Sequence, residues 1–297
     1  MKLLPEINHK KCILCKKCVS ICPKDILAID DNRIVTNAEE CMLCSHCYDI
    51  CPADAISFDP SALRKPEFKG LSYREQVKEK KDIQAGELIN IIRSRRSVRK
   101  YREREVSDSV IDDLISFAVT APSGSNCQNW EFAVINGREK VWGLAREIKT
   151  FFEKINRLVE NPFLRYGTIP FIGTKLLRYY NRNYASVKMA MAEAERGNDR
   201  LFHGAPTVII IHGSLEGSTP LEDAQYASYN MTILAHALGL GTCYIGYAVE
   251  SINRAPGIKK SMGIPGKNRI LAVLTLGYPA VTFKKHSLRK PWSVVKI

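Results

Sequence analysis

The sequence predicts an α+β protein made of a small cysteine-rich front part and a larger part in which helices pack on a sheet. Eight of the ten cysteines lie between residues 12 and 51. Residues 1–60 carry 7 Lys and Arg against 9 Asp and Glu, whereas residues 61–297 carry 37 against 22. After residue 87, segments with helical periodicity alternate with short runs of β-branched residues. These observations predict two domains of different composition and charge.

The overall composition is that of a globular protein. Of the 297 residues, 45% are hydrophobic and 25% are charged. No apolar run approaches the roughly 18 residues needed to cross a bilayer, and the start MKLLPEINHKKC lacks the apolar core of a secretory signal. We therefore expect a cytoplasmic protein with no integral membrane segment, whose thiolates hold metal rather than form disulfides. The basic body suggests anionic ligands or an acidic protein partner.

The cysteines form two copies of one motif, C-x2-C-x2-C-x3-C-P. The first copy consists of Cys12, Cys15, Cys18 and Cys22, and the second, 29 residues later, of Cys41, Cys44, Cys47 and Cys51. Two-residue gaps let three sulfurs face one centre, whereas the fourth cysteine lies too far along the chain to join them easily. Structural zinc sites also use C-x2-C pairs. Two complete copies that each end in Cys-Pro favour iron–sulfur clusters over zinc.

About 60 residues around this motif resemble the two-cluster bacterial ferredoxins. In that arrangement the fourth cysteine of each motif binds the other cluster. The resemblance therefore implies one [4Fe-4S] cluster on Cys12, Cys15, Cys18 and Cys51, and a second on Cys41, Cys44, Cys47 and Cys22. It also implies transfer of single electrons. His46 lies within the second motif, and we predict that it is a loop residue rather than a ligand.

The rest of the chain divides into a connector and a second domain. We predict a ferredoxin-like domain over residues 1–60, a charged linker over 61–86 and an α/β domain over 87–297. Periodicity predicts helices at 87–94, 107–121 and 221–241, the second with Ser107 or Ser109 as a cap, and strands at 130–137, 205–213 and 269–279.

Residues 161–188 mix aromatic side chains with Arg and Lys. This segment could cover the mouth of an active site, dock a partner or lie on a membrane surface. The simpler alternative, which we favour, is a helical insertion whose apolar residues pack.

Four further segments suggest a cofactor. RSRRSVRKYRERE (93–105) concentrates arginine, whose guanidinium groups bind phosphate oxygens in pairs. Alone it would be a solvated basic face. It is joined by APSGSNCQNWEF (121–132), which offers amide side chains to a flavin edge, by the glycine turn of ALGLGTCYIGYA (237–248), and by a basic pair near the end of the chain, in residues 277–292.

In this order, the four segments resemble the nitroreductase family of FMN enzymes over about 200 residues. The resemblance implies a mainly antiparallel central sheet and a homodimer with two FMN sites. It implies that Arg95, Ser97 and Arg99 bind the FMN phosphate and the ribityl chain or ring edge. The Pro-Ser-x-x-Asn-x-Gln motif matches Pro122, Ser123, Asn126 and Gln128, with Asn126 near the ring. The remaining implied contacts are backbone amides of Ile245 and Gly246 at the flavin N5, and Arg289 and Lys290 at the phosphate.

Several nearby residues have no assigned catalytic role. The turn Gly124-Ser125-Asn126 departs from the Gly-Gly that often precedes Asn in the family, which affects the expected substrate preference. We predict that Cys127 and Cys243 are small buried side chains. His203 and Tyr244 could donate protons, but packing or loop roles are favoured.

Taken together, the two halves predict an iron–sulfur flavoprotein oxidoreductase that reduces a nitro-, quinone- or enone-like acceptor. No G-x-G-x-x-G follows a strand, so the sequence shows no Rossmann nicotinamide site. The resemblance to nitroreductases nevertheless implies NAD(P)H as a donor directly at the flavin, and a reduced ferredoxin is the alternative donor. One alternative is an electron-transfer or redox-sensing subunit with little turnover of its own. A nucleic-acid-binding protein is disfavoured, since no recognition motif accompanies the positive charge.

Overall fold

The structure, a computed structural model, describes residues 4–38, 40–73, 84–172 and 174–297. It divides into two compact units. Met1–Glu67 together with Pro122–Gln128 form the first, which we call the cysteine unit, and Phe68–Ala121 together with Asn129–Ile297 form the second, which we call the sheet unit. The predicted linker falls partly on residues 74–83, outside the described residues, and the predicted boundaries at 60 and 86 stay predictions.

The two motif copies of the cysteine unit have the same local structure. The first contains β1 (Glu6–Ile7), α1 (Lys17–Ile21) and β2 (Leu27–Asp30), and the second contains β3 (Arg33–Thr36), α2 (His46–Asp49) and β4 (Ile56–Ser57). Each antiparallel ribbon pairs a strand of one copy with a strand of the other, β1 with β4 and β2 with β3. The repeat in the sequence is therefore a repeat in space whose halves exchange strands.

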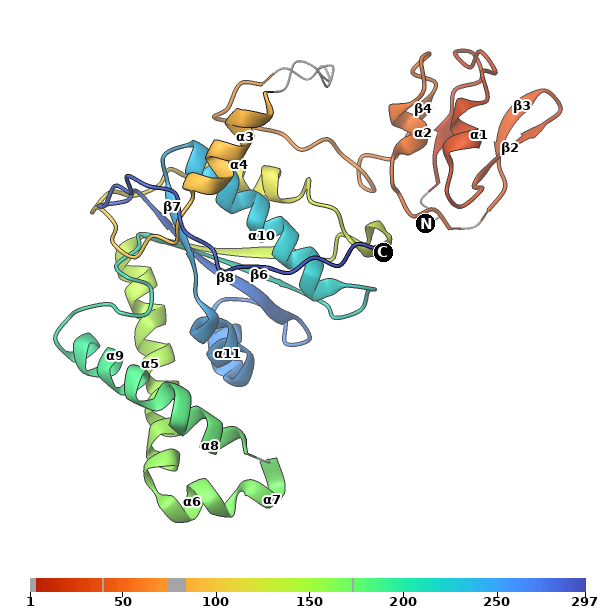
Figure 1. The fold of residues 1–297 in the computed structure, drawn as a ribbon. Helices are drawn as coiled ribbons and strands as arrows, with labels where there is room; N and C mark the ends of the chain where they lie inside the picture. Colours follow the sequence, from red (N-terminus) through yellow and green to blue (C-terminus); the bar gives the residue numbers. More distant parts are fainter. Residues whose placement is uncertain (1–3, 39, 74–83, 173) are drawn as a thin grey trace. The chain divides into compact units, whose positions relative to one another are not determined.

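A four-stranded antiparallel sheet forms the centre of the sheet unit (Figure 1). Its strands run in the order β5-β6-β8-β7. Their bounds are β5 (Glu131–Asn136), β6 (Thr207–Gly213), β7 (Gly241–Tyr244) and β8 (Arg269–Gly277). The α+β class and the mainly antiparallel sheet predicted from the sequence are confirmed.

Helices cover both faces of the sheet. The helices of the sheet unit are α3 (Ala85–Ser94), α4 (Asp108–Ala118), α5 (Arg138–Glu160), α6 (Pro162–Gly167), α7 (Ile169–Ile172), α8 (Lys175–Tyr179), α9 (Ala185–Glu195), α10 (Pro220–Ala237), α11 (Gly246–Arg254) and α12 (Pro256–Ser261). Within the described ranges, none of the helices is both long and apolar enough to span a membrane.

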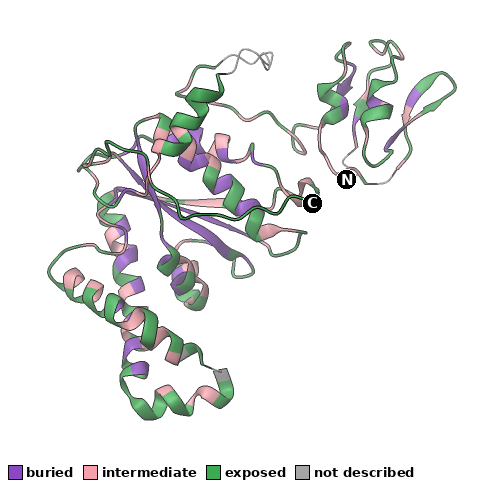
Figure 2. Ribbon diagram, viewed as in Figure 1, coloured by how far each residue is buried: buried purple, intermediate pink, exposed green. Residues whose placement is uncertain are grey.

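Strand β6 shows how the sheet builds two cores. Side chains alternate across a strand, so Ile209 and Ile211 pack with α4 and α10 while Val208 and Ile210 pack with α5 and α11. All seven residues of β6 are buried, which Figure 2 shows as a purple centre between mixed helices. This explains why the sequence of β6 is a continuous apolar run rather than an alternating one.

The ends of the predicted helices agree with the structure in one case and differ in another. After α10, Gly239 adopts the left-handed φ of 74° that ends the helix, as the glycine predicted. Ser107 does occupy the N-cap position of α4, but its side chain caps no backbone amide and instead lies 3.2 Å from the Ser109 hydroxyl. Ser107 is thus at the predicted N-cap position but lacks the side-chain hydrogen bond of a cap.

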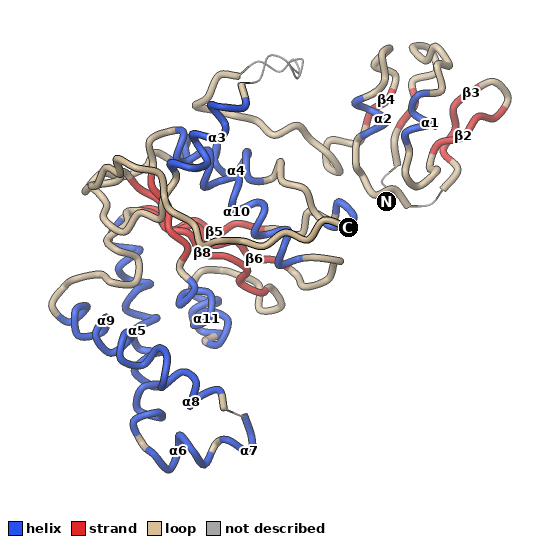
Figure 3. Tube along the Cα trace, viewed as in Figure 1, coloured by secondary structure: helices blue, strands red, loops and turns tan. Residues whose placement is uncertain are grey.

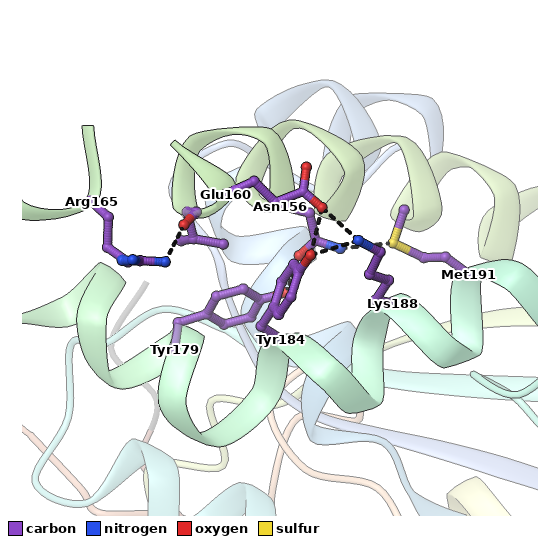
Figure 4. Close-up of polar contacts among 8 residues, drawn as sticks. Asn156, Glu160, Arg165, Tyr179, Tyr184, Lys188 and Met191 are labelled. Carbon is purple, nitrogen blue, oxygen red and sulfur yellow. Dashed lines mark hydrogen bonds and ion pairs between the residues drawn. The ribbon is translucent and has the colours of Figure 1, made fainter. Parts of the chain in front are cut away.

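The segment 161–188 is helical and forms, with α5 and α9, an arm that extends from the sheet (Figure 3). Polar contacts tie its helices together (Figure 4). The Tyr179 hydroxyl donates to Asn156 Oδ1 at 2.8 Å, and Asn156 Nδ2 donates to Met191 Sδ at 3.2 Å. Packing thus explains part of the segment, whereas Phe163 and Phe171 are 88% and 86% exposed.

We expect Asn156→Ala to destabilise the sheet unit by about 1–3 kcal/mol, because the half-buried Tyr179 hydroxyl loses its acceptor. The measurement is the free energy of unfolding from urea titration, followed through α-helical circular dichroism. Arg157→Ala, at the exposed neighbouring position of α5, is the matched control and should change stability by less than about 0.5 kcal/mol. Equal effects of the two variants would contradict this account of the arm.

Candidate functional site

Eight cysteines line two small cavities in the cysteine unit. Ile7, Ile34 and Ile56 help to close the first, and Pro5, Leu27 and Phe58 help to close the second. The cysteines are Cys12, Cys15, Cys18 and Cys51 in the first cavity, and Cys22, Cys41, Cys44 and Cys47 in the second. Each cavity therefore takes three cysteines from one motif and one from the other. Among the described residues, no three or more His, Cys, Asp or Glu side chains gather closely enough to surround a single metal ion.

Left-handed turns bend the cysteine loops around these cavities. Leu14 and Lys16 have φ of 54° and 64°, and their counterparts 29 residues later, Leu43 and Ser45, have φ of 54° and 60°. Such angles cost a non-glycine residue about 1–2 kcal/mol. The same two strained positions in each copy indicate that the surrounding fold, rather than local preference, sets the path of these loops.

Backbone amides point at three of the sulfurs. The Ile26 amide donates to Cys22 Sγ at 3.2 Å, and the equivalent Ala55 amide donates to Cys51 Sγ at 3.3 Å. The Leu43 amide donates to Cys41 Sγ at 3.3 Å. Donors of this kind stabilise negative charge on sulfur and are one of the means by which proteins tune iron–sulfur clusters.

Burial makes the free thiols poor anions. It raises the pKa of Cys18 and of Cys41, and it raises the pKa of Cys47 to about 11. At neutral pH these groups keep their protons unless a metal replaces them, so loading with iron releases protons. Thiolates are the ligands that iron–sulfur clusters prefer.

A second candidate site is a basic cavity of about 880 Å³ in the sheet unit. Arg95, Ser97, Arg99 and Arg289 all line it, so the structure brings together the four residues expected at a phosphate. Among the described residues no Asp or Glu lines it, and Arg96, Lys284 and Lys285 add positive charge. Arg95 Nε is buried and has no hydrogen-bond partner among the described residues. An orphaned guanidinium donor in an all-basic cavity fits an anionic group such as the FMN phosphate.

The arginine–serine stretch is held as an added edge of the sheet. Ser97 bridges to Thr242 of β7, and the Val98 amide donates to the Thr242 carbonyl at 2.9 Å. In an extended chain alternate side chains share a side. Val98 is therefore buried in the protein while Ser97 and Arg99 face the basic cavity.

Gly241 makes this edge possible. A Cβ atom at position 241 would lie 2.6 Å from Val98 Cγ2, inside the contact distance. Glycine is thus required where the arginine–serine stretch crosses β7, a constraint that the glycine turn in the sequence signalled only in general terms.

The Pro-Ser-x-x-Asn-x-Gln loop belongs to the cysteine unit. Asn126 Nδ2 donates to the Met42 carbonyl at 3.0 Å and to the Leu43 carbonyl at 2.8 Å. The Ser123 hydroxyl accepts from the Gln128 amide at 3.1 Å, and Pro122 is exposed. The amide that we expected at a flavin ring therefore contacts the loop between Cys41 and Cys44. Sequence reasoning missed this partner, because an amide side chain can serve either one.

The three remaining residues predicted to contact FMN, Ile245, Gly246 and Lys290, differ in their surroundings. The Ile245 amide donates to the Val273 carbonyl at 2.9 Å, so it is already used within the sheet and the expectation of a bond to flavin N5 is wrong for this residue. Gly246 is the first residue of α11, where backbone amides have no partner within the helix. Lys290 is exposed and does not line the basic cavity.

The structure gives the surroundings of the four residues without an assigned role. Cys243 is buried, as predicted, and burial raises its pKa, whereas Cys127 is only half-buried. The Tyr244 hydroxyl lies 2.8 Å from the Ser228 hydroxyl, and burial raises its pKa. Burial lowers the pKa of His203, which is half-buried and has a left-handed φ of 61°.

Comparison with known proteins decides the family. Residues 92–278 match the model of the nitroreductase family. The chain is a nitroreductase-family protein. Residues 4–52 of this nitroreductase match the model of a 4Fe-4S dicluster domain, which confirms the ferredoxin-like front part. Since the family consists of FMN enzymes, the protein is an FMN-dependent oxidoreductase.

Individual relatives agree. A Methanothermobacter thermautotrophicus protein, whose name pairs NADH dehydrogenase with NAD(P)H nitroreductase, is 30% identical over 199 residues, covering 65% of this chain and 78% of that protein. The 4-nitrobenzoate reductase of a Nocardioides strain is 27% identical, covering 63% and 78%. A Bacteroides fragilis nitroreductase crystallised with bound FMN shares the fold at a TM-score of 0.50 and 19% identity, covering 71% and 99%.

We expect Gly241→Ala to lower stability by about 1–3 kcal/mol and to weaken FMN retention, because the new methyl group pushes Val98 and with it Ser97 out of place. Unfolding free energy and the dissociation constant of FMN measure the two effects. Gly257→Ala, in α12 with open space around the added carbon, is the control and should leave both unchanged. An FMN affinity unaffected by Gly241→Ala would show that the Ser97 edge does not hold the cofactor.

Proposed function

We propose that this nitroreductase is an iron–sulfur flavoprotein that passes electrons through two [4Fe-4S] clusters to FMN and on to a small organic acceptor of nitro, quinone or enone type. The observation that carries the proposal is the contact of Asn126 with the Met42 and Leu43 carbonyls. It joins the family's flavin-loop motif to the loop that bears Cys41 and Cys44 within one compact unit.

The two cysteine cavities support the assignment of ligands. Each offers four thiols, three from one motif and one from the other, which is the division that bacterial two-cluster ferredoxins use. We assign one cluster to Cys12, Cys15, Cys18 and Cys51 and the other to Cys41, Cys44, Cys47 and Cys22. The second cluster is the one whose loop contacts Asn126.

The chain's own residues supply binding and orientation. FMN, when bound, supplies the one- and two-electron chemistry. Arg95, Arg99 and Arg289 would neutralise its phosphate, and Ser97 would donate a hydroxyl hydrogen bond. The Gly246 amide, at the start of α11, is a further donor directed out of the helix. The residues Pro122, Ser123, Asn126 and Gln128 shape the loop that carries the motif.

Asn126 acts in this proposal as a positioning residue rather than a flavin ligand. Its two hydrogen bonds are worth about 0.5–1.5 kcal/mol each, so together they hold the loop against the cluster-bearing segment in most molecules. A fixed loop fixes the path between the cluster and the flavin motif.

Two kinds of electron donor fit the chain. Nicotinamide dinucleotides or a reduced ferredoxin would supply electrons, and the basic residues of the chain favour an acidic protein donor in a salt-sensitive way.

A homodimer is supported by α3, whose Leu88 and Ile89 are 50% and 51% exposed on an amphipathic helix. A second copy of the chain would cover such a face.

Paired cysteine variants test the ligand assignment. We expect Cys22→Ala combined with Cys41→Ala to leave about four irons per chain, because both changes fall on one cluster. Cys22→Ala combined with Cys12→Ala should remove nearly all iron, because each cluster loses one ligand. Iron and sulfide analysis of anaerobically purified protein reads out the count. Retention of four irons in the second pair, with loss of all iron in the first, would reverse the assignment.

Asn126→Ala tests the relay. When fully reduced protein meets a quinone without oxygen, the flavin should be reoxidised first and the clusters afterwards through it. Because the variant loses two hydrogen bonds, we expect cluster reoxidation to slow by about tenfold or more while direct flavin reoxidation is unchanged. Rapid-mixing absorbance separates the two phases.

The matched control for this experiment is Asn129→Ala, whose amide donates to the Glu216 carbonyl instead. Wild-type clusters that stay reduced after the flavin has been reoxidised would refute the relay. A flavin that no acceptor reoxidises would favour the alternative of an electron-transfer or sensing subunit.

A further inference from the structure

A further cavity of the sheet unit lies between α5 and α9, and we call it the apolar chamber. Its volume is about 530 Å³, within the range of small-molecule sites. Its walls include Trp142 and Phe152 from α5, Val187 and Met191 from α9, and Leu201 from the loop after α9. A chamber with such walls favours an apolar ligand, since it removes apolar surface from water.

A larger polar cavity of about 1020 Å³ adjoins the apolar chamber. The two share lining residues, among them Trp142, Arg200 and His203. At another part of its wall the polar cavity contains Arg99, which also lines the basic cavity assigned to the FMN phosphate. The polar cavity thus shares wall residues both with the apolar chamber and, through Arg99, with the proposed flavin site.

Charge distinguishes the polar cavity from the basic one. The basic cavity has six Lys or Arg side chains and no Asp or Glu. The polar cavity has six Lys or Arg but also five Asp or Glu, and Arg138 is paired with Glu103 at 2.5 Å. A nearly balanced wall gives little net attraction to a polyanion such as a phosphate. It suits an uncharged group that accepts hydrogen bonds.

His203 stands where the two spaces meet, since it lines both. Its left-handed φ of 61° is strained for a non-glycine residue, a feature that often marks a binding site. Burial lowers its pKa, so the imidazole is neutral at neutral pH and keeps one donor nitrogen. Arg200 offers further donors beside it. Both can bind a carbonyl oxygen.

We propose that the apolar chamber and the adjoining polar cavity bind an uncharged acceptor with an apolar tail and carbonyl oxygens at one end, of the class of alkyl-substituted quinones. The tail lies between α5 and α9, and the oxygens face His203 and Arg200. The site extends the proposed function by naming the acceptor's class. The binding itself does not depend on electron transfer.

The test uses a decyl-substituted benzoquinone and unsubstituted benzoquinone as probes. Binding to oxidised holoenzyme is followed by quenching of Trp142, which lines both spaces. We expect Ala190→Phe, which fills the chamber, to weaken binding of the decyl quinone by about tenfold, the loss that about 1.4 kcal/mol gives. Binding of the unsubstituted quinone should change by less than about twofold.

Ala192→Phe is the matched control, because this residue is exposed on the same helix and lies outside the chamber. It should leave both affinities unchanged. Ala194→Phe is a second chamber variant, so that the test survives if Ala190→Phe fails to fold, as judged by circular dichroism. Equal affinities for the two quinones, or equal effects of Ala190→Phe and Ala192→Phe, would overturn the proposed site.

The outcomes for the site and for the proposed function can be told apart. Specific binding of the decyl quinone, with a flavin that no nitro, quinone or enone acceptor reoxidises, would leave the site standing and refute the proposed function. A working relay from clusters to flavin, with chamber variants that bind the decyl quinone normally, would support the proposed function and refute the site.

Discussion

The fold of the cysteine unit depends on its thiols meeting in two cavities. Among the described residues, its hydrophobic core cluster contains five buried residues, and two of these are Cys18 and Cys47. A core this small cannot stabilise a domain by apolar burial alone, so metal–thiolate bonds have to supply much of the folding free energy. The strained turns at Leu14 and Leu43 fit the same view, because strain of that kind persists only where stronger bonds hold the loop.

Much of the architecture could be predicted because it depends on periodicity and spacing. The apolar run of β6 predicts a buried strand, and the spacing of the cysteine repeat predicts a repeated unit, although the surrounding fold sets the path of the cysteine loops. The misses have a different physical origin. The type of side chain at Asn126 was evident, but its partners lie 84 and 83 positions earlier in the chain. The Ile245 amide was expected at a ligand, yet a neighbouring strand already accepts its hydrogen. Sequence patterns therefore identify hydrogen-bond donors better than the acceptors that those donors contact in the fold.

Charge placement separates the kinds of ligand that the sheet unit can hold. The net charge of +13 says only that anions are favoured somewhere. The structure concentrates unopposed cations in the basic cavity, where Lys284 and Lys285 from the run FKKH join the arginines. It balances cations with carboxylates in the polar cavity. A phosphate and a neutral acceptor would therefore bind in different cavities, and Arg99 lines both of them.

The loop Pro122–Gln128 carries the family's flavin-loop motif and contacts the segment between Cys41 and Cys44. By contacts it belongs to the cysteine unit, although both of its flanking residues, Ala121 and Asn129, belong to the sheet unit. A segment tethered at both ends has a high effective concentration at its binding partner, so two ordinary hydrogen bonds from Asn126 suffice to hold it there. Separate ferredoxin and flavoprotein chains would have to form that contact by diffusion. In the proposed relay, fusion of the two in one chain would keep so small a contact formed without that diffusion step.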